Sequence, residues 1–365
     1  MGLSAIAVAL QAKSFAVNCF KSSRFDQNYY FNINIKDKNM TKKVVDNKKP
    51  IKNSKNDEKS KKSLFDLYEF MPQKSGFLGV KEKYLKSNDD AKVIVIPFGL
   101  EKSVSYGGGT KNGPQAIIKA SHQAELFDEE FWCEPFRQYG VATMKAQEID
   151  YSSVPKSLDQ LEKITSDVLE AKKFPLILGG EHSITAGSIR PFVKKYKDLA
   201  ILHFDAHADL RDGYAGEHYS HASALRRVMD HPISTLISCG IRNISASEIP
   251  FLESNSSRIK MHFAKDKHAW DYKKIVEPLK GRNVFLTFDI DGFDSGIMQA
   301  TGTPEPGGLL WYDAINIIKE ASKICNIVGA DVVELAPVKT LHSCDFLAAK
   351  LCYKILSFAL AKPQK

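Results

Sequence analysis

Three short stretches of this chain carry side chains of the types that bind metal ions. Residues 205–209 read Asp-Ala-His-Ala-Asp, so on an extended backbone two carboxylates and an imidazole project to one side. Residues 287–291, Thr-Phe-Asp-Ile-Asp, place two more carboxylates at the same spacing, and residues 179–183, Gly-Gly-Glu-His-Ser, add a second imidazole. The six candidate ligands are His182, Asp205, His207, Asp209, Asp289 and Asp291.

These six groups together predict a metal centre. Crowded carboxylates and imidazoles repel one another and lose solvation unless a cation joins them. One ion takes about four to six ligands, so six ligands suit two ions that share bridging carboxylates. Oxygen and nitrogen ligands without thiols favour Mn²⁺ over Zn²⁺. Residues 205–209 taken alone also fit a polar strand end that caps the next helix, and the other two stretches favour the metal site.

Each stretch follows an apolar run that is typical of a buried strand. Between most of these runs lie amphipathic segments, and this alternation predicts a parallel sheet covered by helices on both faces. Ligands on such a sheet bind beyond the carboxyl ends of the strands, where all three stretches fall. We expect strands near 92–98, 138–143, 174–179, 199–204, 234–241, 258–263, 283–290 and 327–334. The amphipathic segments are 114–127, 157–172, 184–197, 217–230, 271–280 and 311–324, with a last helix over about 343–361.

Four motifs in order carry a resemblance to the arginase/agmatinase family of ureohydrolases, over roughly residues 90 to 360. They are Gly179–Ser183, Asp205–Asp209, Thr287–Asp294 and Gly302–Leu309. The resemblance implies an α/β fold, a three-layer αβα sandwich with a mostly parallel eight-stranded sheet. It also implies two Mn²⁺ per subunit, with Ni²⁺ as the alternative, and a homo-oligomer that is a trimer or a hexamer.

The resemblance also assigns roles to individual residues. One metal would be held by the first ligand set, His182, Asp205, Asp209 and Asp289. The other would be held by Asp205, His207, Asp289 and Asp291, so Asp205 and Asp289 would bridge. Glu334 matches the glutamate that pairs with the substrate guanidinium, and His221 matches the active-site histidine, a proton shuttle. Asp209 would protonate the leaving amine, and His203 is expected to pack behind the ligands.

The implied reaction is the hydrolysis of a small guanidino compound to urea and an amine, with agmatine giving putrescine as the first choice. Residues 205–212 followed by 219–223 resemble the agmatinase branch. Arg211 and Asn243 occupy positions where arginases hold the α-amino acid end of arginine, and both are expected to contact substrate. Residues 294–301 depart from the usual family wording, so arginase, guanidinobutyrase and guanidine hydrolase activities remain alternatives. A single-zinc deacetylase and a non-catalytic regulatory homologue are remote alternatives.

Most of the chain's formal charge of +8 lies in its first segment. Residues 1–62 contain 14 basic and 5 acidic residues, whereas the remainder contains 37 and 38. The nearly neutral remainder predicts no nucleic-acid partner, and the lack of an apolar run of about 18 residues predicts no membrane span. We expect a disordered tail over 1–62, a docking segment over 63–90 and a catalytic domain over 91–365. The expected location is cytoplasmic, or mitochondrial if residues 1–25 are a transit peptide; Met40 is an alternative start.

Overall fold

The computed structural model describes residues 63–84 and 87–364, which belong to one compact unit. The predicted tail, residues 1–62, and the possible transit peptide within it lie outside the described residues. No helix in the described part of the chain is both long and apolar enough to cross a bilayer.

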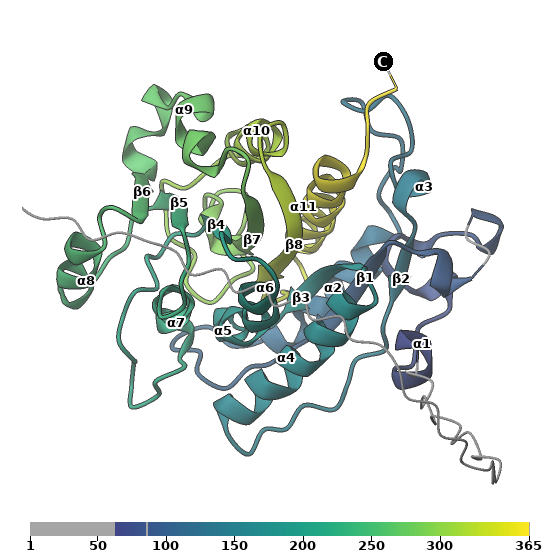
Figure 1. Ribbon diagram of the computed structural model, residues 1–365, viewed down its shortest axis with the longest axis horizontal. Helices are drawn as coiled ribbons and strands as arrows, with labels where there is room; N and C mark the ends of the chain where they lie inside the picture. Colours follow the sequence, from purple (N-terminus) through teal and green to yellow (C-terminus); the bar gives the residue numbers. More distant parts are fainter. Residues whose placement is uncertain (1–62, 85–86, 365) are drawn as a thin grey trace, which may run out of the picture. The chain divides into compact units, whose positions relative to one another are not determined.

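A single eight-stranded sheet forms the centre of this unit, in the order β2-β1-β3-β8-β7-β4-β5-β6 (Figure 1). Every neighbouring pair is parallel. The predicted α/β fold with its eight-stranded parallel sheet is therefore confirmed. The strands are β1 (Val93–Phe98), β2 (Val141–Thr143), β3 (Phe174–Gly179), β4 (Ala200–Phe204), β5 (Thr235–Ile241), β6 (Ile259–Phe263), β7 (Asn283–Asp289) and β8 (Asn326–Val333).

Helices cover both faces of the sheet, and each face has its own apolar core. One core lies between the sheet and α2 (Gly113–Ser121), α9 (Tyr272–Val276), α10 (Trp311–Ser322) and α11 (His342–Leu360). The other core lies under α4 (Val154–Glu170), α5 (Thr185–Ser188), α6 (Arg190–Lys195) and α7 (Ala224–Met229). The remaining α-helices are α1 (Leu64–Leu67), α3 (Phe136–Tyr139) and α8 (Ile249–Ser254).

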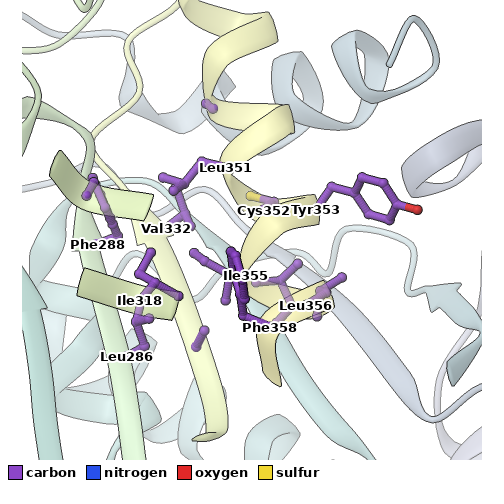
Figure 2. Close-up of a cluster of buried hydrophobic side chains, with 14 of the residues drawn as sticks. Leu286, Phe288, Ile318, Val332, Leu351, Cys352, Tyr353, Ile355, Leu356 and Phe358 are labelled. Atoms are coloured by element: carbon purple, nitrogen blue, oxygen red, sulfur yellow. The ribbon is translucent and has the colours of Figure 1, made fainter. Parts of the chain in front are cut away.

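Alternation along β7 assigns its side chains to the two faces. Figure 2 shows Leu286 and Phe288 in the core beneath α11, together with Ile355 of that helix. Phe285 belongs to the opposite core. Because side chains alternate along a strand, Thr287 and Asp289 share the face of Phe285. This second face therefore changes from apolar to polar as β7 approaches its carboxyl end.

The predicted strands agree with the observed ones, and the differences lie in the connections. Residues 136–139, of which 138 and 139 were expected in a strand, form a short helix. This helix ends at Gly140, whose φ of 61° lets the chain turn into β2. The amphipathic segment 184–197 is divided into α5 and α6. The segment 217–230 becomes α-helical only from residue 224, since residues 221–223 form a 3₁₀ turn and residues 214–217 form a turn closed by two backbone hydrogen bonds.

The described part of segment 63–90 packs against the same compact unit. Leu64, Phe77 and Leu78 are buried, and Phe70 forms an isolated antiparallel bridge with Met144 beyond β2. These apolar residues therefore extend the cores on the side of β1 and β2.

Candidate active site

The six candidate ligands meet at the carboxyl edge of the sheet. His182 lies three residues beyond β3, residues 205–209 follow β4 directly, and Asp289 ends β7. Strands β4 and β7 are neighbours, and β3 is separated from β7 by β8. The parallel sheet thus brings together side chains that are more than one hundred positions apart in the sequence.

A first group of carboxylates surrounds one nitrogen of His182. The Nδ1 atom lies 3.1 Å from Asp205 Oδ2, 3.1 Å from Asp209 Oδ2 and 3.3 Å from Asp289 Oδ2. This nitrogen is buried and has no hydrogen-bond partner. A buried nitrogen without a hydrogen-bond partner, facing three carboxylate oxygens, is the arrangement that a cation would complete.

A second group surrounds His207 and shares one carboxylate with the first. The Nδ1 atom of His207 lies 3.0 Å from Asp291 Oδ2 and 3.4 Å from Asp205 Oδ1. The two oxygens of Asp205 therefore face different histidines, as a bridging carboxylate would require. Asp289 contacts the first group, and its Oδ1 accepts the backbone N–H of Asp291 at 3.0 Å.

Burial makes these carboxylates costly to ionise. It raises the pKa of Asp209 to about 7 and holds the pKa of Asp289 well above its usual value. In Asp205 burial is outweighed by hydrogen bonds to three histidines, first to His182, and the pKa of this carboxyl lies well below the ordinary one. A concentration of buried acids with two imidazoles calls for positive charge, so these His and Asp groups could hold divalent metal ions.

Glu334 follows β8 and reaches the same site. Its Oε1 accepts the backbone N–H of His182 at 2.7 Å, and burial raises the pKa of its carboxyl. Glu334 and Asp209 are non-glycine residues with φ angles of 65° and 52°, in the left-handed region. Such strained backbone costs about 1–3 kcal/mol per residue and is concentrated at functional sites.

These groups open into a cavity of about 210 Å³. Its lining includes five of the six candidate ligands, all except the buried Asp205, together with Glu334 and His221. The glycine-rich stretch 106–113 supplies Tyr106 and Gly107 to this wall.

His221 is held by a loop that the sequence did not single out. Ser103 Oγ accepts the backbone N–H of His221 at 2.9 Å and lies 3.4 Å from its Nδ1, while Ser105 Oγ lies 3.4 Å from its Nε2. Burial lowers the pKa of His221 below its usual value of 6.5. A neutral imidazole therefore faces the cavity at neutral pH.

The loop itself is anchored by Glu181, a fully buried acid that the sequence analysis gave no role. Its Oε2 accepts the backbone N–H groups of Lys102 and Ser103 at 2.6 and 2.5 Å. Its Oε1 accepts the hydroxyls of Ser103 at 2.9 Å and Ser183 at 2.5 Å. The only sequence signal was its place beside His182, because its partners in the loop, Lys102 and Ser103, are 79 and 78 positions away.

Arg211 and Asn243, two of the residues expected to contact substrate, line the same cavity, and Asn243 forms an isolated parallel bridge with the candidate ligand His207. The guanidinium carbon of Arg211 lies 5.0 Å from the centre of the Tyr214 ring. Asn243 donates from Nδ2 to Glu305 Oε1 at 2.7 Å. Both side chains therefore lie on the wall of the cavity, and their contact with substrate stays a prediction.

Known proteins are similar to this chain in sequence and in fold. The model of the arginase family matches residues 91–357. An N(1)-aminopropylagmatine ureohydrolase from Synechocystis is 32% identical over 287 residues, which cover 76% of this chain and 92% of that protein. An agmatinase from Bacillus cereus is 34% identical over 265 residues, which cover 70% and 88% of the two chains. The crystal structure of the agmatine ureohydrolase of Thermoplasma volcanium has a TM-score of 0.68 at 30% identity, covering 76% of this chain and 92% of that one. The resemblance carried by the four motifs is thus confirmed, and this chain belongs to the arginase family.

Proposed function

We propose that this protein hydrolyses a small guanidino compound to urea and an amine, with agmatine as the substrate and putrescine as the product. The observation that carries this proposal is the joint position of two groups in one cavity. The first group consists of the carboxylates that surround the Nδ1 atoms of His182 and His207. The second is Glu334, which lines the same cavity and accepts the backbone N–H of His182.

The donor atoms fit two divalent ions, which we propose to be Mn²⁺, with Ni²⁺ as the alternative. The orphaned Nδ1 of His182 and the two-sided contacts of Asp205 support this assignment. Ions bound there would lower the pKa of water and supply a nucleophile near neutral pH.

The protein's own residues would orient the substrate and move protons. Glu334 would pair with the guanidinium through Oε2, because its Oε1 is already occupied by His182. Asp209 would pass a proton to the leaving amine. His221, held neutral at the cavity wall, would exchange that proton with solvent.

A second candidate substrate is N(1)-aminopropylagmatine, favoured by the name of the Synechocystis relative. It carries the same guanidino group as agmatine and a longer cationic tail. Arginine, guanidinobutyrate and guanidine are the remaining candidates. The trimeric or hexameric assembly and the cytoplasmic or mitochondrial location stay predictions.

A substrate panel tests the proposal. The purified chain would be loaded with Mn²⁺ or Ni²⁺ and assayed for urea with all five compounds at matched concentrations. We expect urea from agmatine or N(1)-aminopropylagmatine at a kcat/KM well above that of the other three. The absence of urea from every compound, in a protein that retains two ions per chain, would overturn the proposed reaction.

A further inference from the structure

A row of buried polar side chains crosses the sheet one layer below the candidate ligands. Ser238, His203, Thr287 and Asp331 are register partners on the adjacent strands β5, β4, β7 and β8. All four are fully buried. Asp205 and Asp289 follow two members of this row by two residues, so they lie on the same face, directly above it. Polar groups at this depth are retained only where they satisfy one another or support the layer above.

The row connects to His182 through two hydroxyl groups. The Nε2 atom of His182 lies 3.0 Å from Thr287 Oγ1, which lies 3.4 Å from Thr185 Oγ1. Thr185 Oγ1 in turn donates to Asp331 Oδ2 at 2.8 Å. This chain runs from the imidazole edge opposite the carboxylate cluster to a fully buried acid.

In this series of hydrogen bonds, only one order of donors and acceptors is possible. Since the Thr185 hydroxyl gives its hydrogen to Asp331, its oxygen can only accept from Thr287. The Thr287 hydroxyl is then used as a donor, so its oxygen accepts from His182, and Nε2 must carry the proton. Asp331 Oδ2 also lies 3.4 Å from the Ser188 hydroxyl and acts as an acceptor whether or not its other oxygen is protonated.

We propose that Asp331, acting through Thr185 and Thr287, fixes His182 in the tautomer whose Nδ1 lone pair faces the metal site. This inference rests on the metal centre of the proposed function. The opposite tautomer would put a hydrogen on Nδ1, where it would block an ion. It would also leave a lone pair on Nε2 facing the Thr287 oxygen, because the single hydrogen of that hydroxyl is already donated to Thr185. Asp331 is thus a positioning residue, although it is fully buried and does not line the cavity.

The test measures metal affinity without substrate, using full-length protein and Mn²⁺ alone, with free Mn²⁺ followed by its electron paramagnetic resonance signal. Thr287→Val keeps the shape of the side chain and removes the hydroxyl. Loss of a group that orients a metal-binding histidine weakens binding by about 10–100-fold. We expect a Kd for Mn²⁺ raised by that factor in Thr287→Val, and a near-normal Kd in Thr287→Ser, which restores a hydroxyl.

Thr165→Val is the matched control, because Thr165 is fully buried in α4 and its hydroxyl has no hydrogen-bond partner. It should leave the Kd unchanged. A Thr287→Val protein whose melting temperature falls while its Kd stays within twofold of the wild type would overturn the inference and leave a purely structural role. If Thr287→Val does not fold, Thr185→Val breaks the same chain one bond further on, and the same criterion applies. A wild-type protein that binds no Mn²⁺ would instead count against the proposed manganese centre, and with it this inference.

Discussion

The side chain of Glu334 is hydrogen-bonded to the backbone of His182, with 2.7 Å between Oε1 and the amide nitrogen. The proposed guanidinium-binding acid is thereby fixed to the residue that offers Nδ1 to the metal site. Both residues leave strand ends, β8 and β3, that are neighbours in the sheet. A shift of either strand would therefore change the distance between substrate and metal site, which explains why strained backbone is maintained at Glu334.

Asp289→Asn should abolish urea production and reduce the bound metal. The Asp289 carboxylate would bridge the two proposed ions and neutralise part of their charge, whereas an amide cannot. A rate loss of about a thousandfold or more is therefore expected. Metal content by elemental analysis and kcat on agmatine are the measurements. Asp198→Asn, at an exposed position, is the control. Full metal content with near-normal turnover in the Asp289 variant would refute its role.

His221→Ala should lower kcat much more than it raises KM, because a group that moves protons acts mainly in the transition state. General acid–base contributions run to about 10²–10⁴-fold. Burial lowers the pKa of His221 below 6.5, so the wild-type rate should fall as the pH drops through that lowered pKa and His221 becomes protonated. The variant should lack this limb of the pH profile. A raised KM with unchanged kcat would make His221 a substrate-binding residue.

Ser103→Ala should reduce kcat by up to about a hundredfold, since small displacements of a catalytic group can cost that much. The Ser103 hydroxyl connects Glu181 to the backbone N–H of His221. Ser183→Ala is a matched comparison, because that hydroxyl donates to the same oxygen of Glu181, whereas the backbone N–H of His221 donates to Ser103 Oγ. Steady-state kinetics of both variants decide the matter: equal losses would assign the effect to Glu181 alone.

Agmatine should be a better substrate than arginine, by at least about a hundredfold in kcat/KM. Arginine brings an α-ammonium and a carboxylate into the cavity, and the side chains of Asn243 and Ser245 on its wall carry no charge to pair with the ammonium. Each unpaired polar group costs about 1–3 kcal/mol. Competition between the two substrates, followed by urea release, measures the ratio. Equal efficiency with arginine would show that Arg211 binds a substrate carboxylate.

Removal of residues 1–62 should leave kcat and the melting temperature unchanged. That segment carries a net charge of +9, from 14 basic and 5 acidic residues, which the nearly neutral remainder does not share. Both apolar cores and all candidate site residues lie beyond it. Circular dichroism melting and the urea assay compare the two forms. An insoluble or inactive product would mean that the first segment is needed for folding.

The sequence predicted the sheet well, and it predicted that the six candidate ligands would lie at one edge of it, because both predictions depend on local patterns. Apolar runs mark strands, and ligands at alternate positions mark one side of a strand end. It could not predict the support beneath them. Thr287 and Asp331 are 44 positions apart and meet only through the pairing of β7 with β8. Ser103 and Glu181 meet through a loop whose path depends on tertiary packing, and a serine or threonine in an apolar segment carries no signal by itself.

The order of strands in the sheet also has a consequence for how the protein is made. Strands β3 and β4 are consecutive in the chain, yet β8 and β7 lie between them. A growing chain that ends before residue 283 already contains His182, Asp205, His207 and Asp209, but it lacks the two central strands that join its halves. Those strands bring Asp289, Asp291 and Glu334 with them. The proposed metal centre therefore cannot form until both strands have been synthesised, so a stalled or truncated chain holds four of the candidate ligands and no framework to join them.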